Sequence, residues 1–343
     1  MNISAKPWTS KQLPRRILVI RLQAMGDVVI TLPYLQHLRN SLPPSVRIDF
    51  LTRAESAPIP NSMVLFDNVF AAGGGRNLKK VLLHILWMLP KLLWQRYDVV
   101  IDLQNNSYSD TVRKAIRPKA WSVFDRFSPL AAGERNRLTI EAIGLGANQM
   151  DTTLKLKDAN AGAAILRANG WSGTDSLVVL NPAGFVVTRN WPINNYAAFA
   201  QLWLQQFPAT TFLLLGTSFI AEKGAFLENA LGNRIISLIG KTTPAEAFVV
   251  LQHAALVLSE DSGLMHMAWV SGVPTLALFG STRSDWARPL GKHSFFVDSS
   301  DLACGNCMQA VCKFGDVRCL TRHTPELVVQ YALALIQKNK RSS

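Results

Sequence analysis

Three places in the 343-residue chain combine acidic, basic and small residues at spacings that could support chemistry. The first is Met25-Gly26-Asp27, which follows the apolar run Ile17–Leu22. A glycine allows the backbone to turn tightly there, and a carboxylate that follows a strand can serve as a general base. Aspartate is also a favoured helix N-cap. Asp27 therefore has two interpretations, a catalytic base or a cap.

The second place is Ser259–His266, where acidic and small residues follow a predicted strand. Ser262 and Gly263 would open the next helix, and the free amide groups at a helix N-terminus attract anions. Asp261 fits either a ligand contact or the cap of that helix. His266 fits either a phosphate contact or core packing. The segment therefore predicts an anion site. For Asp261 and for His266, both the ligand-binding and the structural interpretation stay open.

The third place is a pair of basic residues that each follow a predicted strand. Arg189 comes after the strand Leu177–Asn181, and Lys241 comes after the strand Arg234–Ile239. Both could reach a diphosphate from the ends of these strands. The alternative is that both are solvated loop charges, which is the usual situation of Lys and Arg.

The elements that must position these residues alternate between short apolar runs and amphipathic stretches. This alternation predicts βαβ units with parallel sheets. It restarts after the polar stretch near Lys155–Asn160, so we expect two doubly wound halves joined near residue 160. Ligands of such sheets bind beyond the carboxyl ends of the strands, and with two halves the expected site is the cleft between them.

Common nucleotide-binding motifs are missing from these halves. Gly144-Leu-Gly146 lacks the third glycine of the dinucleotide fingerprint, and Gly240-Lys241-Thr242 lacks the first glycine of a P-loop, because position 235 is Ile. Neither G-x-S-x-G nor H-E-x-x-H occurs. Hydride transfer, P-loop phosphoryl transfer and esterase chemistry are therefore disfavoured.

The composition narrows the possible partners. The chain has 36 Lys and Arg against 23 Asp and Glu, a formal charge of +13, and 48% hydrophobic residues. This much apolar material excludes a disordered chain. The basic residues are scattered rather than gathered in a tail, so an anionic ligand or an anionic membrane surface is favoured over nucleic acid. Residues 1–16 lack the apolar region of a secretory signal, so we expect a cytoplasmic protein.

Several motifs resemble glycosyltransferase family nine, the ADP-heptose:lipopolysaccharide heptosyltransferases. They are ILVIRLQAMGDVVITLP (Ile17–Pro33), RNWP (Arg189–Pro192), LIGKT (Leu238–Thr242), EDSGLMHMAWVSGVPTLALFG (Glu260–Gly280) and a late cysteine cluster that ends in CLTRHTPELV. The resemblance covers nearly the whole chain. The opening motif and D-S-G-x-x-H with V-P-x-x-x-L-F-G are specific in combination.

The resemblance implies an α/β fold of the GT-B architecture, with two Rossmann-like, doubly wound parallel-sheet domains that face a cleft. Residues 1–160 would bind the acceptor and residues 161–324 the nucleotide sugar. The helix in 325–343 would pack back on the N-terminal domain. The implied reaction is an inverting transfer without a catalytic metal, in which Asp27, at the turn made by Gly26, deprotonates an acceptor hydroxyl.

The resemblance also assigns a donor-binding set. The expected donor is ADP-heptose, and the expected acceptor is a lipid-linked glycan such as the lipopolysaccharide core. The donor set comprises Arg189, Glu222, Lys241, Thr242, Asp261, Ser262, Gly263 and His266. The sequence departs from the family pattern in two places, and these departures weaken the assignment of the donor sugar. Family members often carry Lys in place of Arg189, and hydroxyl residues in place of Gly184 and Phe185.

Two other functions are compatible with the same residues. One is a sugar-nucleotide epimerase-like enzyme on this fold, which would need one substrate and no acceptor. The other is a non-catalytic protein that binds an anionic lipid or a nucleotide. In the second case, replacing Asp27 would leave function intact.

All four cysteines lie within sixteen residues, as Cys304-x2-Cys307-x4-Cys312-x6-Cys319. Four thiolates could hold a structural zinc, which is one interpretation. The other is a packed or redox-prone loop, because the spacing differs from that of paired C-x-x-C motifs. In neither case do we expect a catalytic role.

A basic and aromatic stretch lies in the first half. Lys79, Lys80 and Arg96 flank the apolar segment Val81–Trp94, which is too short to span a membrane. Basic ends with Trp anchors suit a helix that lies on an anionic bilayer; a buried domain helix is the alternative. We expect a peripheral protein on the cytoplasmic face of the inner membrane.

Overall fold

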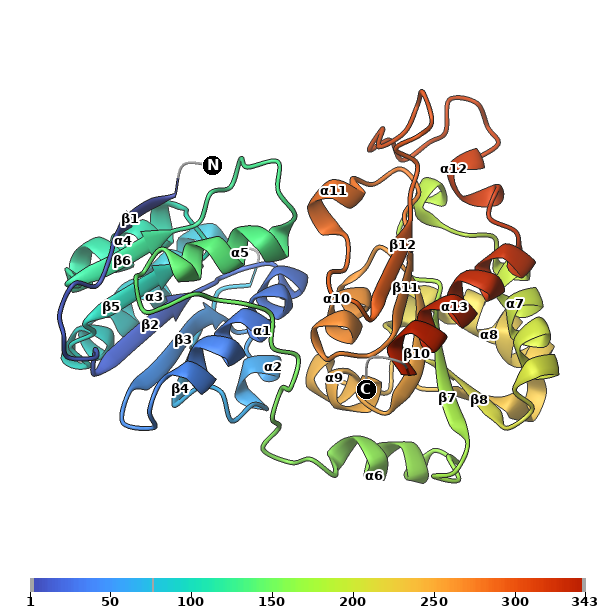
Figure 1. The fold of residues 1–343 in the computed structure, drawn as a ribbon, viewed down its shortest axis with the longest axis horizontal. Helices are drawn as coiled ribbons and strands as arrows, with labels where there is room; N and C mark the ends of the chain where they lie inside the picture. Colours follow the sequence, from blue (N-terminus) through green and yellow to red (C-terminus); the bar gives the residue numbers. More distant parts are fainter. Residues whose placement is uncertain (1–2, 76, 341–343) are drawn as a thin grey trace. The chain divides into compact units, whose positions relative to one another are not determined.

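The computed structural model describes residues 3–75 and 77–340. It divides the chain into two compact units, Met1–Lys157 and Asp158–Ser343, close to the boundary expected after residue 160 (Figure 1). Each unit is an α/β domain built on its own six-stranded sheet.

The elements follow one another in chain order. The first unit contains β1 (Ser4–Lys6), β2 (Arg16–Ile20), α1 (Met25–Ser41), β3 (Arg47–Arg53), α2 (Pro58–Asn61), β4 (Asn68–Ala72), α3 (Leu78–Trp94), β5 (Val99–Asp102), α4 (Ser107–Ile116), β6 (Ala120–Val123) and α5 (Ala132–Glu141). The second unit contains α6 (Ala161–Ala168), β7 (Ser176–Asn181), η1 (Val187–Arg189), α7 (Ile193–Gln206), β8 (Thr210–Leu214), η2 (Ser218–Ile220), α8 (Ala221–Leu231), η3 (Gly232–Arg234), β9 (Ile235–Ser237), α9 (Pro244–Leu251), β10 (Ala254–Glu260), α10 (Gly263–Val270), β11 (Thr275–Leu278), α11 (Ser284–Ala287), β12 (Ser294–Val297), α12 (Arg318–Thr321) and α13 (Pro325–Lys340).

The sheet of the first unit has the order β1-β6-β5-β2-β3-β4. The β1 strand is antiparallel to β6, and the other pairs are parallel. Ile17 to Ile20 on β2 are fully buried, as expected for a central parallel strand with helices on both faces. The chain winds outward from β2 to β4 and then returns to the other side of β2 at β5. The strand order therefore reverses between β2 and β5.

The sheet of the second unit has the order β12-β11-β10-β7-β8-β9, and all its strand pairs are parallel. Here the reversal lies between β7 and β10. In open α/β sheets the crevice at the carboxyl ends of such strands is where ligands bind. The predicted strand Leu177–Asn181 corresponds to β7, and the strand predicted before the segment Ser259–His266 corresponds to β10.

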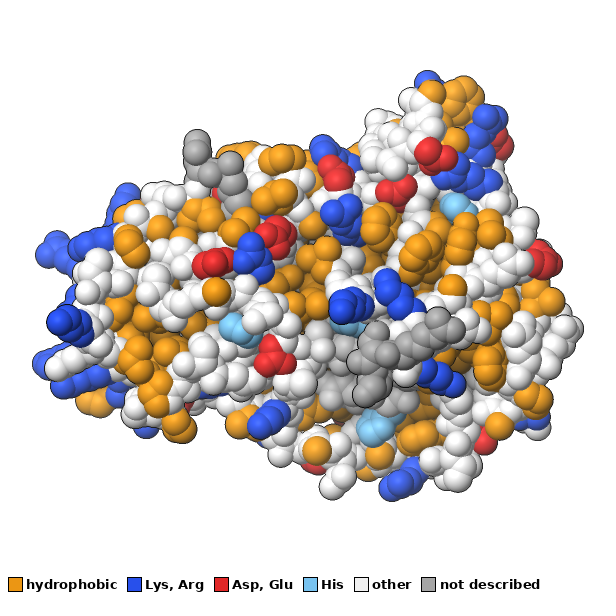
Figure 2. All heavy atoms as spheres, viewed as in Figure 1, with side chains coloured by type: hydrophobic (Ala, Val, Ile, Leu, Met, Phe, Trp, Pro, Cys, Tyr) orange, Lys and Arg blue, Asp and Glu red, His pale blue; other side chains and the backbone are white. Residues whose placement is uncertain are grey.

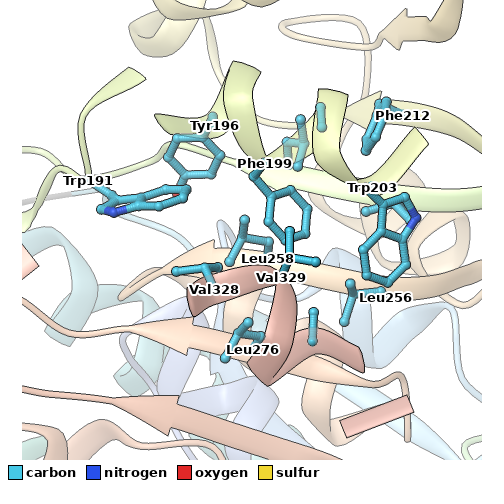
Figure 3. Close-up of a cluster of buried hydrophobic side chains, with 14 of the residues drawn as sticks. Trp191, Tyr196, Phe199, Trp203, Phe212, Leu256, Leu258, Leu276, Val328 and Val329 are labelled. Carbon is cyan, nitrogen blue, oxygen red and sulfur yellow. The ribbon is translucent and has the colours of Figure 1, made fainter. Parts of the chain in front are cut away.

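An aromatic core lies on one face of the second sheet. Trp191 and the α7 residues Tyr196, Phe199 and Trp203 pack there against apolar strand residues (Figure 3). Helix α13 adds four buried side chains to the same core, those of Val328, Val329, Ala332 and Leu335. One face of α13 is thus part of the second unit's own core. Packing of its remaining surface on the first domain stays a prediction, and residues 341–343 lie outside the described residues.

Helix α3 covers one face of the first sheet. It buries Val81, Ile85, Met88 and Leu92, which recur every three or four residues and so form one helix face. Within the described ranges, no helix has both the length and the apolarity needed to cross a membrane.

Candidate active site

Asp27 lies at the carboxyl end of β2, beside the point where the strand order of the first unit reverses. It occupies the third position of α1, and Ala24 is the N-cap. The Oδ2 atom of Asp27 accepts a hydrogen bond from the amide of Ala24 at 2.9 Å. Asp27 therefore helps to cap α1 as part of a capping box, but it is not the N-cap residue that one of our interpretations expected.

The second oxygen of Asp27 pairs with a buried arginine. Arg21 Nη2 lies 3.1 Å from Asp27 Oδ1, and the Asp27 side chain keeps 40% of its surface exposed. Arg21 also donates through Nη1 to the carbonyl of Leu103, which follows the neighbouring strand β5. Arg21 thus links the two strands at the reversal point and fixes the orientation of the Asp27 carboxylate.

Other cations surround this pair. Arg21 and Arg135 both stack on the Phe124 ring, at 5.0 and 5.1 Å from its centroid. Burial is the main cause that lowers the pKa of each guanidinium, and Arg21 lowers that of Arg135 further. This part of the first unit presents positive charge around one partly exposed carboxylate, which suits an anionic ligand.

A buried hydrogen-bond network joins the central strands of the second unit. Asn181, the last residue of β7, donates through Nδ2 to Ser259 Oγ on β10 at 2.7 Å and to Ser262 Oγ at 2.8 Å. Ser262 is the N-cap of α10 and accepts from the amide of Met265 at 3.3 Å. The N-terminus of α10 is therefore fixed directly at the reversal point between β7 and β10.

The first amides of α10 are open. Gly263 is exposed, and a Cβ placed on it would meet no atom within 4 Å. Across the described part of the chain, the amides of Gly263 and Leu264 have no hydrogen-bond partner. Two open amides at the positive end of a helix dipole can bind an anion, so they form a candidate anion site.

Glu260 is the last residue of β10 and is completely buried. Its Oε2 atom accepts from the amide of Gly184 at 2.5 Å, and its Oε1 atom accepts from the amide of Trp191 at 2.6 Å. Burial raises the pKa of Glu260 to about 7, although Lys223 and the two amides favour the charged form. One carboxylate therefore holds both ends of the loop that carries Arg189; residues 182–191 are called the donor loop below.

Lys223 on α8 holds the same loop from another side. Its Nζ donates to the carbonyl of Pro182 at 2.8 Å and to Oδ1 of Asn190. Burial lowers the pKa of Lys223, and the nearby Glu260 opposes that shift. The donor loop is therefore fixed by a buried acid and a half-buried base that come from different elements.

Gly184 allows the donor loop to close on itself. A Cβ at this position would lie 2.4 Å from the carbonyl oxygen of Arg189. The neighbouring Phe185 is 74% exposed and stacks on Phe219 at a centroid distance of 4.8 Å. Glycine at 184 is thus a packing requirement of this loop, whereas Phe185 places an aromatic surface in solvent.

The sequence pattern of glycosyltransferase family 9, the heptosyltransferases, matches residues 86–318, which is more than half of the chain. The chain belongs to glycosyltransferase family 9. Lipopolysaccharide heptosyltransferase 1 of Pseudomonas aeruginosa is 25% identical to this family member over 94% of this chain and 98% of that protein.

Solved structures of the family share the fold. The family 9 glycosyltransferase of Veillonella parvula superposes with a TM-score of 0.80 at 20% identity, covering 96% of this chain and all of that one. The Escherichia coli heptosyltransferase WaaC with ADP-2-deoxy-2-fluoro heptose gives a TM-score of 0.65 at 19% identity, covering 93% and 99%. The two parallel-sheet domains are those of a GT-B glycosyltransferase, as the sequence predicted.

The structure brings some predicted donor residues of this family 9 enzyme together and leaves others apart. Ser262, Gly263 and His266 share the first turn of α10, and the donor loop that carries Arg189 is held to the end of β10 by Glu260. His266 is nearly buried, and its Nδ1 accepts from Trp269 Nε1 at 3.1 Å. This bond leaves the proton of a neutral imidazole on Nε2.

Asp261 precedes the N-cap Ser262 and is half-buried. It was expected as either cap or ligand contact, and the structure shows that it is not the cap. Of the described residues, none forms a hydrogen bond or an ion pair with its side chain.

The structure does not bring Lys241 together with the predicted donor residues of α10. Its Nζ is exposed and donates to the carbonyl of Ser237 at 3.0 Å, so the side chain runs back along β9. Thr242 is half-buried beside it, and Glu222 is exposed in the first turn of α8. Lys223, one residue after Glu222, is the α8 side chain that reaches the donor loop.

The cysteine segment supports the donor loop from outside the anion site. All four cysteines carry free thiols and line one pocket of about 430 Å³. Thr188 Oγ1 in the donor loop donates to the carbonyl of Gln309 in this segment at 2.6 Å. Within the described ranges, no three His, Cys, Asp or Glu side chains converge on a metal position. The zinc site that was one of the two interpretations of these cysteines stays a prediction, and Cys319 lies in the short helix α12.

Sequence reasoning missed the residues that position the others, namely Arg21, Glu260 and Lys223. Two of them had a visible signal, because Arg21 follows the apolar run of β2 directly and Glu260 ends that of β10. A charge at the end of a buried strand needs a partner, but the sequence does not say which.

Proposed function

We propose that this family 9 enzyme transfers a heptose from ADP-heptose to a lipopolysaccharide-core acceptor, with inversion and without a catalytic metal. The observation that carries the proposal is the open α10 N-terminus next to the donor loop, at the reversal point of the second sheet. Two relatives support the substrates. The Pseudomonas aeruginosa protein is named lipopolysaccharide heptosyltransferase 1, and the WaaC structure contains an ADP-heptose analogue.

In this proposal the second unit binds the donor diphosphate. The amides of Gly263 and Leu264 and the guanidinium of Arg189 would stabilise the negative charge that develops as the diphosphate leaves. His266 would donate its Nε2 proton to a phosphate oxygen, and Lys241 would add charge after a change of rotamer. Glu222, which is exposed, would accept hydrogen bonds from ribose hydroxyls. Thr242 and Asp261 complete the proposed donor contacts.

The first unit supplies the base. Asp27 takes the proton of an acceptor hydroxyl, whose oxygen then forms a bond to the anomeric carbon while the bond from that carbon to the diphosphate breaks. One displacement from the opposite face inverts the configuration. Arg21 acts as a positioning residue, because it holds Asp27 Oδ1 while the exposed part of the carboxylate can meet the acceptor.

A metal is not required by this scheme. Metal ions in other transferases neutralise the charge of the leaving diphosphate. Here the same charge would meet Arg189 and the positive end of the α10 dipole. The reaction should therefore proceed in the presence of EDTA.

The acceptor suggests where the enzyme works. A lipid-linked glycan is held in a membrane, and α3 presents the apolar and basic surface that an interfacial helix needs. We propose peripheral contact with the cytoplasmic face of an anionic inner membrane.

The test of donor identity is a comparison of ADP, UDP and GDP as stabilising ligands. A nucleotide that binds only the folded protein stabilises it, by about 2.7 kcal/mol at one hundred times its Kd. We expect a clear rise in Tm with ADP alone. A rise with UDP or GDP alone would remove the heptosyl assignment.

A further inference from the structure

Helix α3 is apolar on two faces, and only one of them is covered. Val81, Ile85, Met88 and Leu92 are buried in the core of the first unit. The opposite face is made of Leu83, Leu86, Trp87, Leu93 and Trp94. The exposed fractions of Trp87 and Trp94 are 81% and 79%, so most of the surface of each residue faces solvent. Contiguous apolar patches are rare on soluble proteins and mark interaction surfaces.

The last turn of α3 borders a basic pocket of about 960 Å³. The pocket lies at the amino ends of β2, β5 and β6, which is the edge of the sheet opposite to Asp27. Leu93 and Trp94 line it together with five cations and one carboxylate, Asp98. The five cations are Arg15, Arg16, Arg96, Arg117 and Lys119. Figure 2 shows Lys and Arg side chains gathered at this end of the first unit, on the left of the view.

Most of this positive charge is uncompensated. Asp98 already accepts from Lys119 Nζ at 2.9 Å and from the Arg15 amide at 2.9 Å, and these bonds lower its pKa against the effect of burial. None of the four arginines forms an ion pair with any residue in the described part of the chain. The Nη1 atom of Arg16 is enclosed and has no hydrogen-bond partner there. The pocket therefore matches an anion that can accept several hydrogen bonds.

Two of the arginines occupy backbone positions that favour glycine. Arg96, after α3, and Arg117, the C-cap of α4, have φ values of 54° and 50°. A left-handed conformation costs a side-chain-bearing residue about 1 kcal/mol relative to glycine. Charged side chains stand where glycine would fold more easily, and both border the same pocket.

We propose that this pocket binds the phosphate of an anionic lipid headgroup while the exposed face of α3 lies in the bilayer interface. Guanidinium groups match phosphate oxygens in geometry and charge, and exposed tryptophans lie favourably at the interface. The occupant is a lipid rather than a free phosphate because the pocket is continuous with the apolar face through Leu93 and Trp94. The inference rests on the proposed membrane acceptor, but the pocket is separate from the residues assigned to the reaction.

The test compares binding of the full chain to vesicles of phosphatidylcholine alone and of phosphatidylcholine with phosphatidylglycerol. The key variant is R96G/R117G, which removes two charges at positions where glycine suits the backbone, so its fold should be at least as stable. Each arginine near an anionic surface contributes about 5-fold to binding, so we expect a loss of about 30-fold on anionic vesicles. The variant R234Q/K292Q removes two exposed charges from the second unit and should bind like the parent.

A second variant, W87S/W94S, separates the apolar contribution from the charge. It should weaken binding to both kinds of vesicle, whereas R96G/R117G should affect only the anionic kind. Stabilisation by ADP should be unchanged in both variants, so the result is independent of donor identity. The proposal is overturned if R96G/R117G binds anionic vesicles as tightly as the parent does, or if R234Q/K292Q loses as much binding as R96G/R117G. It is also overturned if soluble glycerol phosphate binds the chain as tightly as the anionic vesicles do.

Discussion

The Trp191 amide donates a 2.6 Å hydrogen bond to Oε1 of Glu260, which is 69 residues later in the chain. The other oxygen of the same carboxylate accepts from Gly184. Arg189 lies between these two anchor points. A buried acid at the end of the central strand β10 thus fixes the loop that we assign to the donor diphosphate, and several expectations depend on this arrangement.

The first prediction concerns two glycines with opposite surroundings. Gly184→Ala places a Cβ 2.4 Å from the Arg189 carbonyl oxygen, so the donor loop must move. We expect this variant to lower the free energy of unfolding by about 1–3 kcal/mol and to weaken ADP binding. Urea unfolding and calorimetric titration with ADP measure the two effects.

Gly263→Ala is the matched control for stability. A Cβ there meets no atom within 4 Å, so the free energy of unfolding should not fall. ADP binding should nevertheless weaken, because the new methyl group lies at the proposed anion site. Equal stability loss in both variants would contradict the close packing that we assign to Gly184.

The second prediction is a pH effect from Glu260. Burial raises its pKa from 4.5 to about 7 in the folded protein. Between these two pH values the folded chain keeps a proton that the unfolded chain has lost. Raising the pH through this window therefore lowers the free energy of unfolding, by up to about 3 kcal/mol, and the effect is complete above pH 7.

Glu260→Gln removes the titrating group and keeps its shape. The stability of the parent relative to this variant should fall as pH rises from about 5 to 8. Urea unfolding of both proteins at several pH values measures this difference. A constant difference across the window would show that Glu260 does not hold a proton in the folded state.

The third prediction separates Lys223 from its neighbours. Lys223→Met leaves the Pro182 carbonyl and Asn190 Oδ1 without their donor. We expect KM for the donor to rise by about 10-fold, which corresponds to about 1.4 kcal/mol. The exposed Lys292→Met should change nothing. Steady-state kinetics with varied donor would contradict the role if both variants behaved like the parent.

The fourth prediction concerns the base. Asp27→Asn keeps the size of the side chain but cannot accept a proton at the working pH. We expect kcat to fall by about 10²- to 10⁴-fold while the Kd for ADP stays unchanged. Asp110→Asn, which removes an ion-paired carboxylate of the same unit, is the control and should keep full activity. An equal loss of ADP affinity in Asp27→Asn would indicate a structural role instead.

Much of the fold could be predicted because its signals are local. The runs Ile17–Leu22 and Leu177–Asn181 are apolar enough to be buried strands, and the alternation with amphipathic helices indicated doubly wound sheets. The strands β1, β4, β6 and β12 escaped prediction because they are short and only partly buried. Their place depends on pairing with distant strands, which no local pattern records.

The site was predicted less completely, for a related reason. Asp27, Ser262 and Gly263 follow strands, and their types alone indicate chemistry. Glu260 and Lys223 act through bonds to backbone atoms far away in sequence, so their type and spacing carry no sign of those partners. Lys241 was assigned from its place after a strand, but its side chain bonds to Ser237 instead.

The most direct measurement is a transfer assay that follows the mass of the acceptor. The purified chain is incubated with ADP-heptose and a lipopolysaccharide-core acceptor in the presence of EDTA, with Asp27→Asn in parallel. We expect the acceptor to gain the mass of one heptose, ADP to be released in equal amount, and both signals to be lost in Asp27→Asn. Conversion of the donor without any mass gain on the acceptor, or equal transfer by Asp27→Asn, would contradict the account.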